Sequence, residues 1–477
     1  MSQKKAKQKR REEKAKTQRD IFNEIKKKNI EVNLLRTAQI LDKTITQSLC
    51  ETVFKTVRTD ERQRVWTLYA MVEFWNAVIL NAPKSLRQAL EEAGEGSPQW
   101  PDVESSPEAF FQRSQHLSWR FFAATHEAFC RRMGKIADLG FAQECLSLRE
   151  RFSEVYILDG STLDAIGHLL KILRQEPDTV LPGSILAVYD LFRGYAPIVA
   201  FFENTNESEM KRLETILDRI PQRSLLIADR LYATAKLFGI LGEHKLSGLF
   251  RRHASLSLRK QKLLSRKRVP GGVLEDWLVE AGSGWKGTPQ PLLRWVIFRS
   301  RKQGSYELLT NVLEPKELSA EEAMELYGYR WSVERLFYDL KEVLNLHHFY
   351  AGNVNAVAMQ VYAAAMVHTA MRMAQARIAR QTGIRGEQLS TEKFFPRMAA
   401  AIARYEGMRA GAQWIKDLNP EVRLKEPNWN QSKVGSVRLH QILVEPRKES
   451  PPRTDLRKTR NKKGYKSLHE IMLYSQN

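Results

Sequence analysis

The segment from Tyr327 to Lys341 sets four functional side chains at helical spacing. They are Tyr327, Arg330, Glu334 and Lys341, with two, three and six residues in the gaps between them. Because an α-helix has about 3.6 residues per turn, these positions share one face within an arc of roughly 60°. A carboxylate flanked by two cations and a phenol is suited to holding a metal ion beside a phosphate. The segment therefore predicts a helix with one chemically active face.

The same stripe could be an ordinary solvated surface, with Arg330 and Glu334 as an i, i+4 ion pair. Apolar neighbours weaken that interpretation: Trp331, Leu336, Phe337, Tyr338, Leu340 and Leu344. We therefore expect the stripe to border a hydrophobic core. Further carboxylates on strand ends would decide between the two interpretations.

Two short apolar runs upstream each lead into an aspartate. Val155–Leu158 is followed by Asp159, and Ser224–Ala228 is followed by Asp229. Runs of this length and composition predict buried strands. Between them the pattern predicts two more strands, at 185–192 and 197–203, and an amphipathic helix at about 207–220. The expected order is strand, strand, strand, helix, strand.

That order, with acids after the first and fourth strands and on a later helix, resembles the ribonuclease-H-like α/β fold. Taken singly, each aspartate favours a turn or helix-cap role, but the conjunction is far more specific. The chain resembles DDE-superfamily transposases of bacterial insertion sequences, in the insertion-sequence-four group. Tyr327, Arg330, Glu334 and Lys341 match every gap of that group's signature. Asp159 and Asp229 match its two aspartates, in the contexts Asp-Gly-Ser-Thr and Ala-Asp-Arg-Leu-Tyr.

The resemblance implies metal-dependent phosphoryl transfer on DNA. Asp159, Asp229 and Glu334 would be the catalytic residues and the ligands of two Mg²⁺ ions, for which Mn²⁺ could substitute. Tyr327, Arg330 and Lys341 would bind DNA phosphates. The expected reaction is strand cleavage at the terminal inverted repeats of an insertion sequence, followed by strand transfer into target DNA (cut-and-paste transposition).

Two other functions stay open. Another ribonuclease-H-like DNA nuclease would share the acids but would lack the Tyr-Arg-Glu-Lys face and the long insertion. A host-retained DNA-binding protein derived from a transposase would be favoured by the loss of an acid, and the sequence keeps all three expected acids.

Charge supports a polyanionic partner. The net charge is +21 over 477 residues, which favours double-stranded DNA, although ribosomal or membrane-surface binding would also suit a basic surface. Residues 1–30 carry 12 Lys and Arg against 4 Asp and Glu, and residues 431–477 carry 11 against 4. Both segments are expected to be basic tails that contact phosphates without reading sequence.

The remaining chain divides by its periodicity. Residues 31–150 are predicted to form a helical N-terminal domain that, by resemblance, binds the inverted repeats, with Asp60–Leu80 and Ser118–Arg132 as candidate recognition helices. Simple helical packing is an equally good interpretation of both. The catalytic domain is placed at 151–351 and a helical C-terminal region at 352–430.

The 104 residues between Asp229 and Glu334 are too many for the fold alone and predict a β-rich insertion at about 243–318. Its strands are expected at 248–258, 272–280, 292–298 and 306–312, with Ser265–Arg268 as a basic turn. By resemblance, Trp295 would stack on a base flipped out of the DNA end. Core packing of Trp295 is nearly as compatible with the sequence.

The cysteines and the apolar runs of the sequence bear on the cellular compartment, and the expected reaction bears on the oligomeric state. Cys50, Cys130 and Cys145 form no Cys-x-x-Cys pair, which favours a reduced cytosolic chain. No apolar run reaches the length of a membrane span. We expect a cytoplasmic, nucleoid-associated bacterial protein that acts as a homodimer on paired DNA ends.

Overall fold

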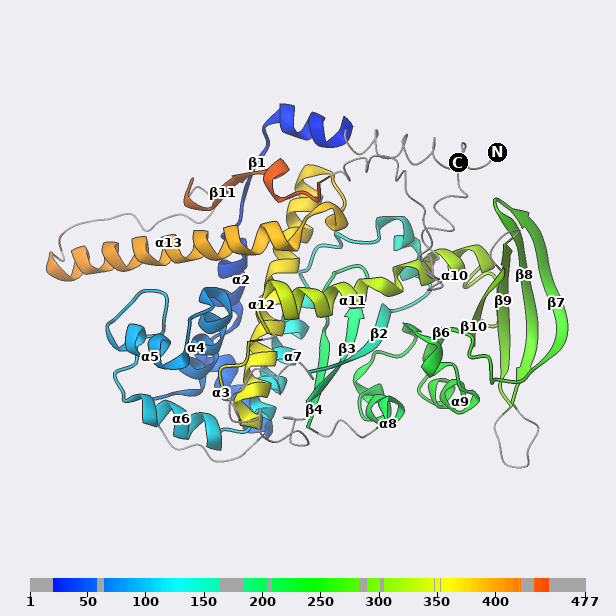
Figure 1. Ribbon diagram of the computed structural model, residues 1–477, viewed down its shortest axis with the longest axis horizontal. Helices are drawn as coiled ribbons and strands as arrows, with labels where there is room; N and C mark the ends of the chain where they lie inside the picture. Colours follow the sequence, from blue (N-terminus) through cyan, green and yellow to red (C-terminus); the bar gives the residue numbers. More distant parts are fainter. Residues whose placement is uncertain are drawn as a thin grey trace, which may run out of the picture.

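The computed structural model is a mixed α/β protein with one large sheet and many helices, so the predicted α/β class is confirmed (Figure 1). The residues that it describes are 20–57, 64–163, 183–203, 208–282, 290–300, 304–346, 348–351, 353–419, 421 and 433–445. Most of both predicted tails, at 1–19 and 446–477, therefore lies outside the described residues.

The sheet has nine strands in the order β4-β3-β2-β5-β6-β10-β9-β8-β7. Its first five strands form the part that carries the predicted acids: β2 (Val155–Thr162), β3 (Ser184–Asp190), β4 (Ile198–Phe202), β5 (Leu225–Ala228) and β6 (Ser247–Arg251). β3 runs antiparallel to β2 and β4, while β5 runs parallel to β2 and to β6. The chain order β2, β3, β4, helix, β5 is the expected one.

Alternating side chains of β2 enter two different cores, as the period of two of a strand requires. Val155 and Ile157 lie in a core that includes α10 (Ala320–Tyr327), α11 (Trp331–Tyr338) and α12 (Val354–Thr382). Tyr156 and Leu158 lie in a second core with α8 (Glu209–Glu214) and α9 (Ala235–Glu243). The two groups of helices therefore cover opposite faces of the sheet. The helix predicted at 207–220 is shorter than expected, because α8 ends at Glu214 and a separate 3₁₀ turn follows at Leu217–Arg219.

The described strands of the insertion continue the same sheet. Its strands are β7 (Leu258–Val269), β8 (Gly272–Ala281), β9 (Leu292–Ser300) and β10 (Gly304–Thr310). β10 pairs with β6, which itself belongs to the parallel part. The predicted insertion at about 243–318 thus begins at the end of α9 and includes the core strand β6.

The predicted turn at Ser265–Arg268 is wrong, because these residues pair with β8 in the second half of β7. β7 is a largely exposed edge strand, and cross-strand acids balance its cations: Arg259 reaches Glu280 and Arg266 lies 3.3 Å from Glu275. Opposite charges across β7 and β8 stabilise this strand pair, which the pattern of apolar residues in the sequence does not predict.

Helices of the N-terminal region surround the central helix α12. They are α2 (Arg36–Thr44), α3 (Gln47–Val57), α4 (Leu68–Asn81), α5 (Leu86–Gly94), α6 (Pro107–His116) and α7 (Arg120–Gly134). α12 packs on α2, α4, α6 and α7 and on the edge strand β4. α4, part of the candidate recognition helix Asp60–Leu80, is buried on most sides, which excludes it as an exposed reading helix.

The last long helix, α13 (Thr391–Leu418), projects from the body (Figure 1). Beyond it, β11 (Ser436–Arg438) pairs antiparallel with β1 (Glu31–Asn33) near the start of the described chain. The tail predicted from residue 431 therefore includes ordered structure up to Glu445. The three cysteines are buried free thiols, and among the described residues no helix is long and apolar enough to cross a membrane.

Candidate active site at the end of the sheet

The two predicted aspartates lie level with each other on neighbouring strands. β2 and β5 pair in parallel as far as Ile157 and Ile227, and two residues further along each strand come Asp159 and Asp229. Neighbouring strands lie about 4.8 Å apart, so the register alone brings the two side chains to the same edge. β2 was expected to end at Asp159 but runs on to Thr162, because Asp159 to Thr162 still pair with β3.

The predicted helix face is built from three kinds of helical turn. α10 ends at Tyr327, a 3₁₀ turn covers Gly328–Arg330, α11 follows, and Asp339–Val343 form a π-helical turn. The expectation of one uniform α-helix is therefore wrong. The π turn adds a residue to the last turn and changes the direction of Lys341, and turns of this kind are frequent at functional sites.

Arg330 lies between two of the predicted acids. Its Nη2 donates to Oε1 of Glu334 at 2.6 Å, and its Nη1 is 3.6 Å from Oδ2 of Asp159. The Arg330 side chain is only 10% exposed, so both contacts are largely shielded from water. The helix and the first strand thus share one guanidinium, and we refer to Asp159, Asp229, Glu334 and Arg330 as the carboxylate site.

Lys341 and Tyr327 occupy different positions relative to this site. Nζ of Lys341 donates to Oγ of Ser161 at 2.8 Å, two residues beyond Asp159 on the same strand face. Tyr327 is 2% exposed, and its ring meets that of Tyr306 edge to face with centroids 5.9 Å apart. Burial, and then Tyr306 and Asp229, raise the pKa of Tyr327, while Arg330 acts in the opposite direction. Tyr327 therefore lies beneath the carboxylate site.

In the carboxylate site, negatively charged side chains outnumber the single positive charge of Arg330. Burial raises the pKa of Asp159 to about 6. Arg330 and the amide of Gly160 oppose this shift, and the carboxylates of Glu209 and Glu334 reinforce it. Several carboxylates around one arginine are a setting in which a further cation would be favourable.

A buried anchor holds the helix that carries Glu334. Asp339, 1% exposed, accepts hydrogen bonds from Arg335 and from Thr391 of α13, each at 3.1 Å, and lies 3.5 Å from Nε2 of His368 on α12. Burial alone would raise the pKa of Asp339, but His368 and the arginines lower it. Asp339 falls inside the signature and has apolar neighbours, but the helical spacing does not indicate that it serves as an anchor.

Glu209 was also missed by the sequence analysis. Its Oε2 accepts a 2.9 Å hydrogen bond from the hydroxyl of Tyr232, and its Oε1 lies over Gly160, beside Asp159. The available signal was Tyr232 in the Ala-Asp-Arg-Leu-Tyr context, whose partner on a distant helix could not be read from spacing.

Trp295 lies on β9, away from the carboxylate site. It stands opposite Trp277 on β8 and packs against the second core. The Arg252 guanidinium lies 4.9 Å from its ring centroid and Nζ of Lys260 lies 5.3 Å away. Trp295 is therefore a partly buried ring with cations nearby. This position is compatible both with core packing and with stacking on a flipped base.

The donor set suits a hard divalent cation, because all of the candidate ligands are carboxylate oxygens. At Gly160, an added Cβ would lie 3.0 Å from Oε1 of Glu209, so the glycine permits the close approach of this carboxylate to the strand. In the described part of the chain, however, no three acidic, histidine or cysteine side chains are already gathered as a ligand cluster. Glu334 would have to exchange Arg330 for a cation.

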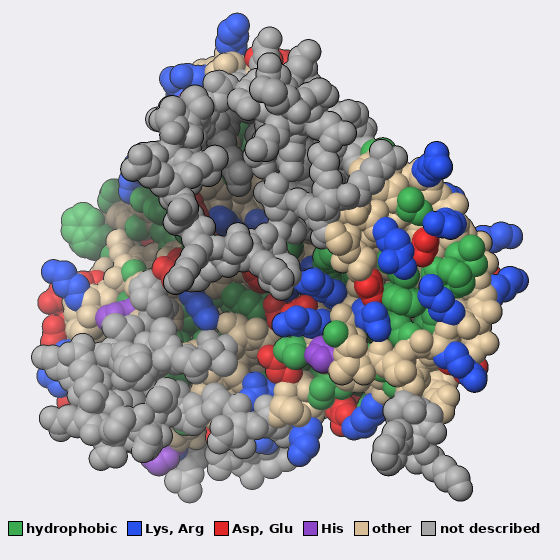
Figure 2. All heavy atoms as spheres, turned by 45° about the vertical axis from the view of Figure 1, so that its right-hand side comes forward, with side chains coloured by type: hydrophobic (Ala, Val, Ile, Leu, Met, Phe, Trp, Pro, Cys, Tyr) green, Lys and Arg blue, Asp and Glu red, His purple; other side chains and the backbone are tan. Residues whose placement is uncertain are grey.

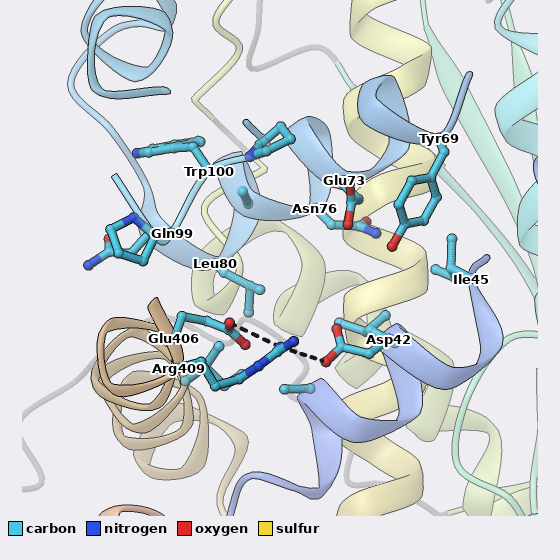
Figure 3. Close-up of a pocket in the computed structure, with 16 residues that line it drawn as sticks. Asp42, Ile45, Tyr69, Glu73, Asn76, Leu80, Gln99, Trp100, Glu406 and Arg409 are labelled. Carbon is cyan, nitrogen blue, oxygen red and sulfur yellow. Dashed lines mark hydrogen bonds and ion pairs between the residues drawn. The ribbon is translucent and has the colours of Figure 1, made fainter. Parts of the chain in front are cut away.

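A second acidic region lies elsewhere, and we refer to it as the helical cavity. It has a volume of about 190 Å³ between α2, α4 and α13 and includes Asp42, Glu73, Glu406 and Arg409 (Figure 3). Arg409 is 3.9 Å from Oδ2 of Asp42 and 3.3 Å from Oε2 of Glu406. None of the predicted site residues lines it.

Comparisons with known proteins relate this chain to transposases. Residues 151–370 match the family model of the transposase DDE domain. The chain is 27% identical over 165 residues to the probable transposase for insertion sequence element IS5377 of Geobacillus stearothermophilus, covering 34% of this chain and 42% of the relative. It is 27% identical over 175 residues to the candidate transposase y4zB of Sinorhizobium fredii, covering 36% and 47%. The chain thus spans under half the length of these curated relatives.

Among solved structures, the chain is similar to a piggyBac transposase in a synaptic complex with hairpin DNA. The TM-score is 0.36 at 12% identity, over 84% of this chain and 87% of the other. The family match rests on sequence instead, and its bounds enclose the carboxylate site, Tyr327, Lys341 and Trp295. The central part of the chain, residues 151–370, accordingly matches the transposase DDE domain.

Proposed function

We propose that the protein is a DNA transposase with a ribonuclease-H-like core. It would cleave DNA at the terminal inverted repeats of an insertion sequence and transfer the freed strand into target DNA. The observation that carries the proposal is the guanidinium of Arg330 between Asp159 and Glu334, with Asp229 level on the next strand. These residues come from three separate parts of the chain and fall within the matched domain.

In this proposal Asp159, Asp229 and Glu334 hold two Mg²⁺ ions, or Mn²⁺ in their place. The bound ions would activate the attacking oxygen and stabilise the leaving oxygen at a phosphate. The Glu334 side chain is 40% exposed, which leaves it space to turn from Arg330 toward the strands. Arg330, released from Glu334, would then face the phosphate that arrives with the DNA.

The remaining signature residues take roles that their positions support. Lys341 would exchange Ser161 for a DNA phosphate, since its Nζ already faces the strand that carries Asp159. Tyr327 is buried, so we propose that it supports Arg330 from below and does not contact the phosphate backbone directly. The preserved spacing of all four residues supports assignment to the insertion-sequence-four group.

The partner would be double-stranded DNA, held largely through its phosphates. Basic side chains are spread over the right-hand half of the face in Figure 2. β7 alone carries Arg259, Lys260, Lys262, Arg266, Lys267 and Arg268 and no acid. Trp295, beside Lys260, would stack on a flipped base at the DNA end. Two copies would act together on paired ends.

The test is strand cleavage and joining on DNA that carries the element's own flanking repeats, with Mg²⁺ or Mn²⁺. Asp159→Asn, Asp229→Asn and Glu334→Gln should each abolish both steps while end binding, measured by gel shift, persists. Undiminished activity in any one variant would remove that residue from the site. Binding by the wild type without cleavage would favour a retained DNA-binding protein.

A further inference from the structure

Glu209 reaches the carboxylate site from the face of the sheet opposite to Glu334. In β2, Val155 and Ile157 face the core with α11, and Tyr156 and Leu158 face the core with α8. By the same alternation Asp159 faces α11 and Gly160 faces α8. Glu209 begins α8 and lies over Gly160.

The absence of a side chain at residue 160 permits this approach. A Cβ placed there would lie 3.0 Å from Oε1 and 3.3 Å from Cδ of Glu209. These separations are tighter than ordinary van der Waals contact, so an alanine would have to push the carboxylate away from the strand. The glycine thus brings Oε1 of Glu209 close to the backbone that carries Asp159.

The other oxygen of Glu209 is fixed by a buried tyrosine. Tyr232, 1% exposed, donates from its hydroxyl to Oε2 at 2.9 Å. It ends the 3₁₀ turn Arg230–Tyr232, which starts immediately after Asp229. Burial and the neighbouring carboxylates raise the pKa of Tyr232, so the hydroxyl keeps its proton and remains a donor. The 3₁₀ turn that follows Asp229 therefore carries the hydroxyl that holds Glu209 in place.

Oε1 of Glu209 thus lies against Gly160, the residue next to Asp159 in the chain, while Oε2 is held in place. The negative charge of Glu209 is close enough to raise the pKa of Asp159. A carboxylate held by a buried donor against a site of like charge is unfavourable unless a cation balances it. Hard divalent cations take six or more oxygen ligands, so a fourth carboxylate has a place at such a site.

We propose that Glu209 supplies a fourth carboxylate to the divalent-cation site, with Tyr232 as the positioning residue that fixes it. The inference rests on the proposed function and adds a ligand that the Tyr-Arg-Glu-Lys signature and the two aspartates do not include. Glu209 and Glu334 then close the site from the two faces of the sheet, and Asp159 and Asp229 form its floor.

Mn²⁺ binding to the full chain without DNA, measured by titration calorimetry, tests this separately from activity. Glu209→Gln should weaken Mn²⁺ binding by about 10-fold to 100-fold, and Tyr232→Phe by about 10-fold. Glu214→Gln is the matched control, because Glu214 lies on the same helix and pairs at the surface with Lys236 at 2.8 Å. The control should bind Mn²⁺ like the wild type.

Two further variants guard against a folding artefact. Gly160→Ala leaves every carboxylate in place and should also weaken Mn²⁺ binding, because it displaces Glu209. Glu209→Asp keeps the charge but shortens the reach, and should recover part of the affinity that Glu209→Gln loses. Circular dichroism and Tm identify any variant that fails to fold.

The outcomes separate the two proposals. If Asp159→Asn abolishes Mn²⁺ binding but Glu209→Gln and Gly160→Ala bind like the wild type, Glu209 is not a ligand and the proposed function stands. If the wild type binds no Mn²⁺, both proposals fail. Parallel losses in Glu209→Gln and Gly160→Ala, with Glu214→Gln unchanged, establish the fourth carboxylate.

Discussion

The carboxylate site and the helical cavity both place several acids around one arginine, yet their construction differs. In the carboxylate site two aspartates come from paired strands and Glu334 from a helix held by the buried Asp339. In the helical cavity Asp42, Glu73 and Glu406 come from three helices, and aromatic and apolar side chains such as Trp100, Leu41 and Ile402 form much of the wall (Figure 3).

The two arginines show the same contrast. Arg330 is 10% exposed and lies between its two carboxylates, whereas Arg409 is 51% exposed at the cavity. A count of acids around an arginine therefore does not identify a cation site. What distinguishes the carboxylate site is that the sheet register fixes two aspartates side by side and the helix supplies a third carboxylate. Each prediction below either compares a change at one position with a matched change at another or tests one of the two regions directly.

The largest contrast is expected in catalysis. Asp229→Asn should reduce strand cleavage by about 10³-fold, because it removes a proposed ligand of the ions that would stabilise the charge developing on the reacting oxygens. Glu73→Gln in the helical cavity should leave cleavage within about 2-fold of the wild type, since no step of the proposed reaction uses it. Cleavage rates on the same end DNA compare the two, and equal losses would contradict the distinction.

The next effect concerns the rigidity of the carboxylate site. Arg294 is fully buried on β9, binds Asp276 through two nitrogens, and donates to the carbonyls of Val312 and Leu318 in the segment that enters α10. Arg294→Met should lower the free energy of unfolding by about 3–5 kcal/mol, because it strands a buried carboxylate.

The matched control for Arg294 is another arginine of the insertion. Arg259 is 74% exposed and pairs with Glu280 across β7 and β8. Arg259→Met should change stability by less than about 0.5 kcal/mol. Denaturant unfolding measures the stability of both variants. A similar loss of stability in each would show that the buried Arg294–Asp276 pair contributes no more than the exposed Arg259–Glu280 pair.

A smaller effect should separate the two arginines by their response to metal. Arg330→Gln should destabilise the chain by about 1–3 kcal/mol in EDTA, the value of a hydrogen bond to a charged group. Mg²⁺ should restore part of that loss, because the ion replaces the missing positive charge. Arg409→Gln should show no recovery with Mg²⁺. Thermal unfolding with and without Mg²⁺ measures the recovery of each variant. Equal recovery in the two variants would contradict the distinction between the two arginines.

The smallest effect is a pH dependence in the helical cavity. Burial raises the pKa of Glu406 from 4.5 to about 7, with Arg409 opposing the shift and Asp42 and Glu73 adding to it. The folded state thus holds this proton more tightly than the unfolded chain, so stability falls as pH rises from about 4.5 to 7.

Glu406→Gln removes that proton and should flatten the decline. Between pH 5 and pH 8 the wild type should lose on the order of 1 kcal/mol more than the variant. Urea unfolding at the two pH values measures the difference. A steeper decline in the variant would mean that the ion pair with Arg409 outweighs the burial of Glu406.

Much of the carboxylate site could be predicted, because its information is local. Asp159 and Asp229 each follow a run of apolar residues, and the strand register then brings them together without further help. Arg330 and Glu334 are one helical turn apart and meet as the spacing requires. Local periodicity and strand ends are the signals that sequence carries best.

The parts that were missed depend on contacts between distant segments. Glu209 contacts Gly160 and Tyr232 through tertiary packing, which residue spacing in the sequence does not indicate. Arg294 is buried in the structure, although its sequence context does not distinguish it from a surface arginine. The basic run at Ser265–Arg268 seemed to be a turn because its stabilising acids lie on β8. The π turn at Lys341 escaped notice because helical spacing assumes a constant period.

The most direct test of the central claim uses Fe²⁺ in place of Mg²⁺ to cut the polypeptide at its own binding site. With ascorbate and peroxide, we predict fragments from cleavage near Asp159, Asp229 and Glu334, suppressed by excess Mg²⁺ and absent in Asp159→Asn. Fragments that instead map near Asp42, Glu73 and Glu406, or cleavage that Mg²⁺ does not suppress, would show that the carboxylate site is not where the chain binds its metal.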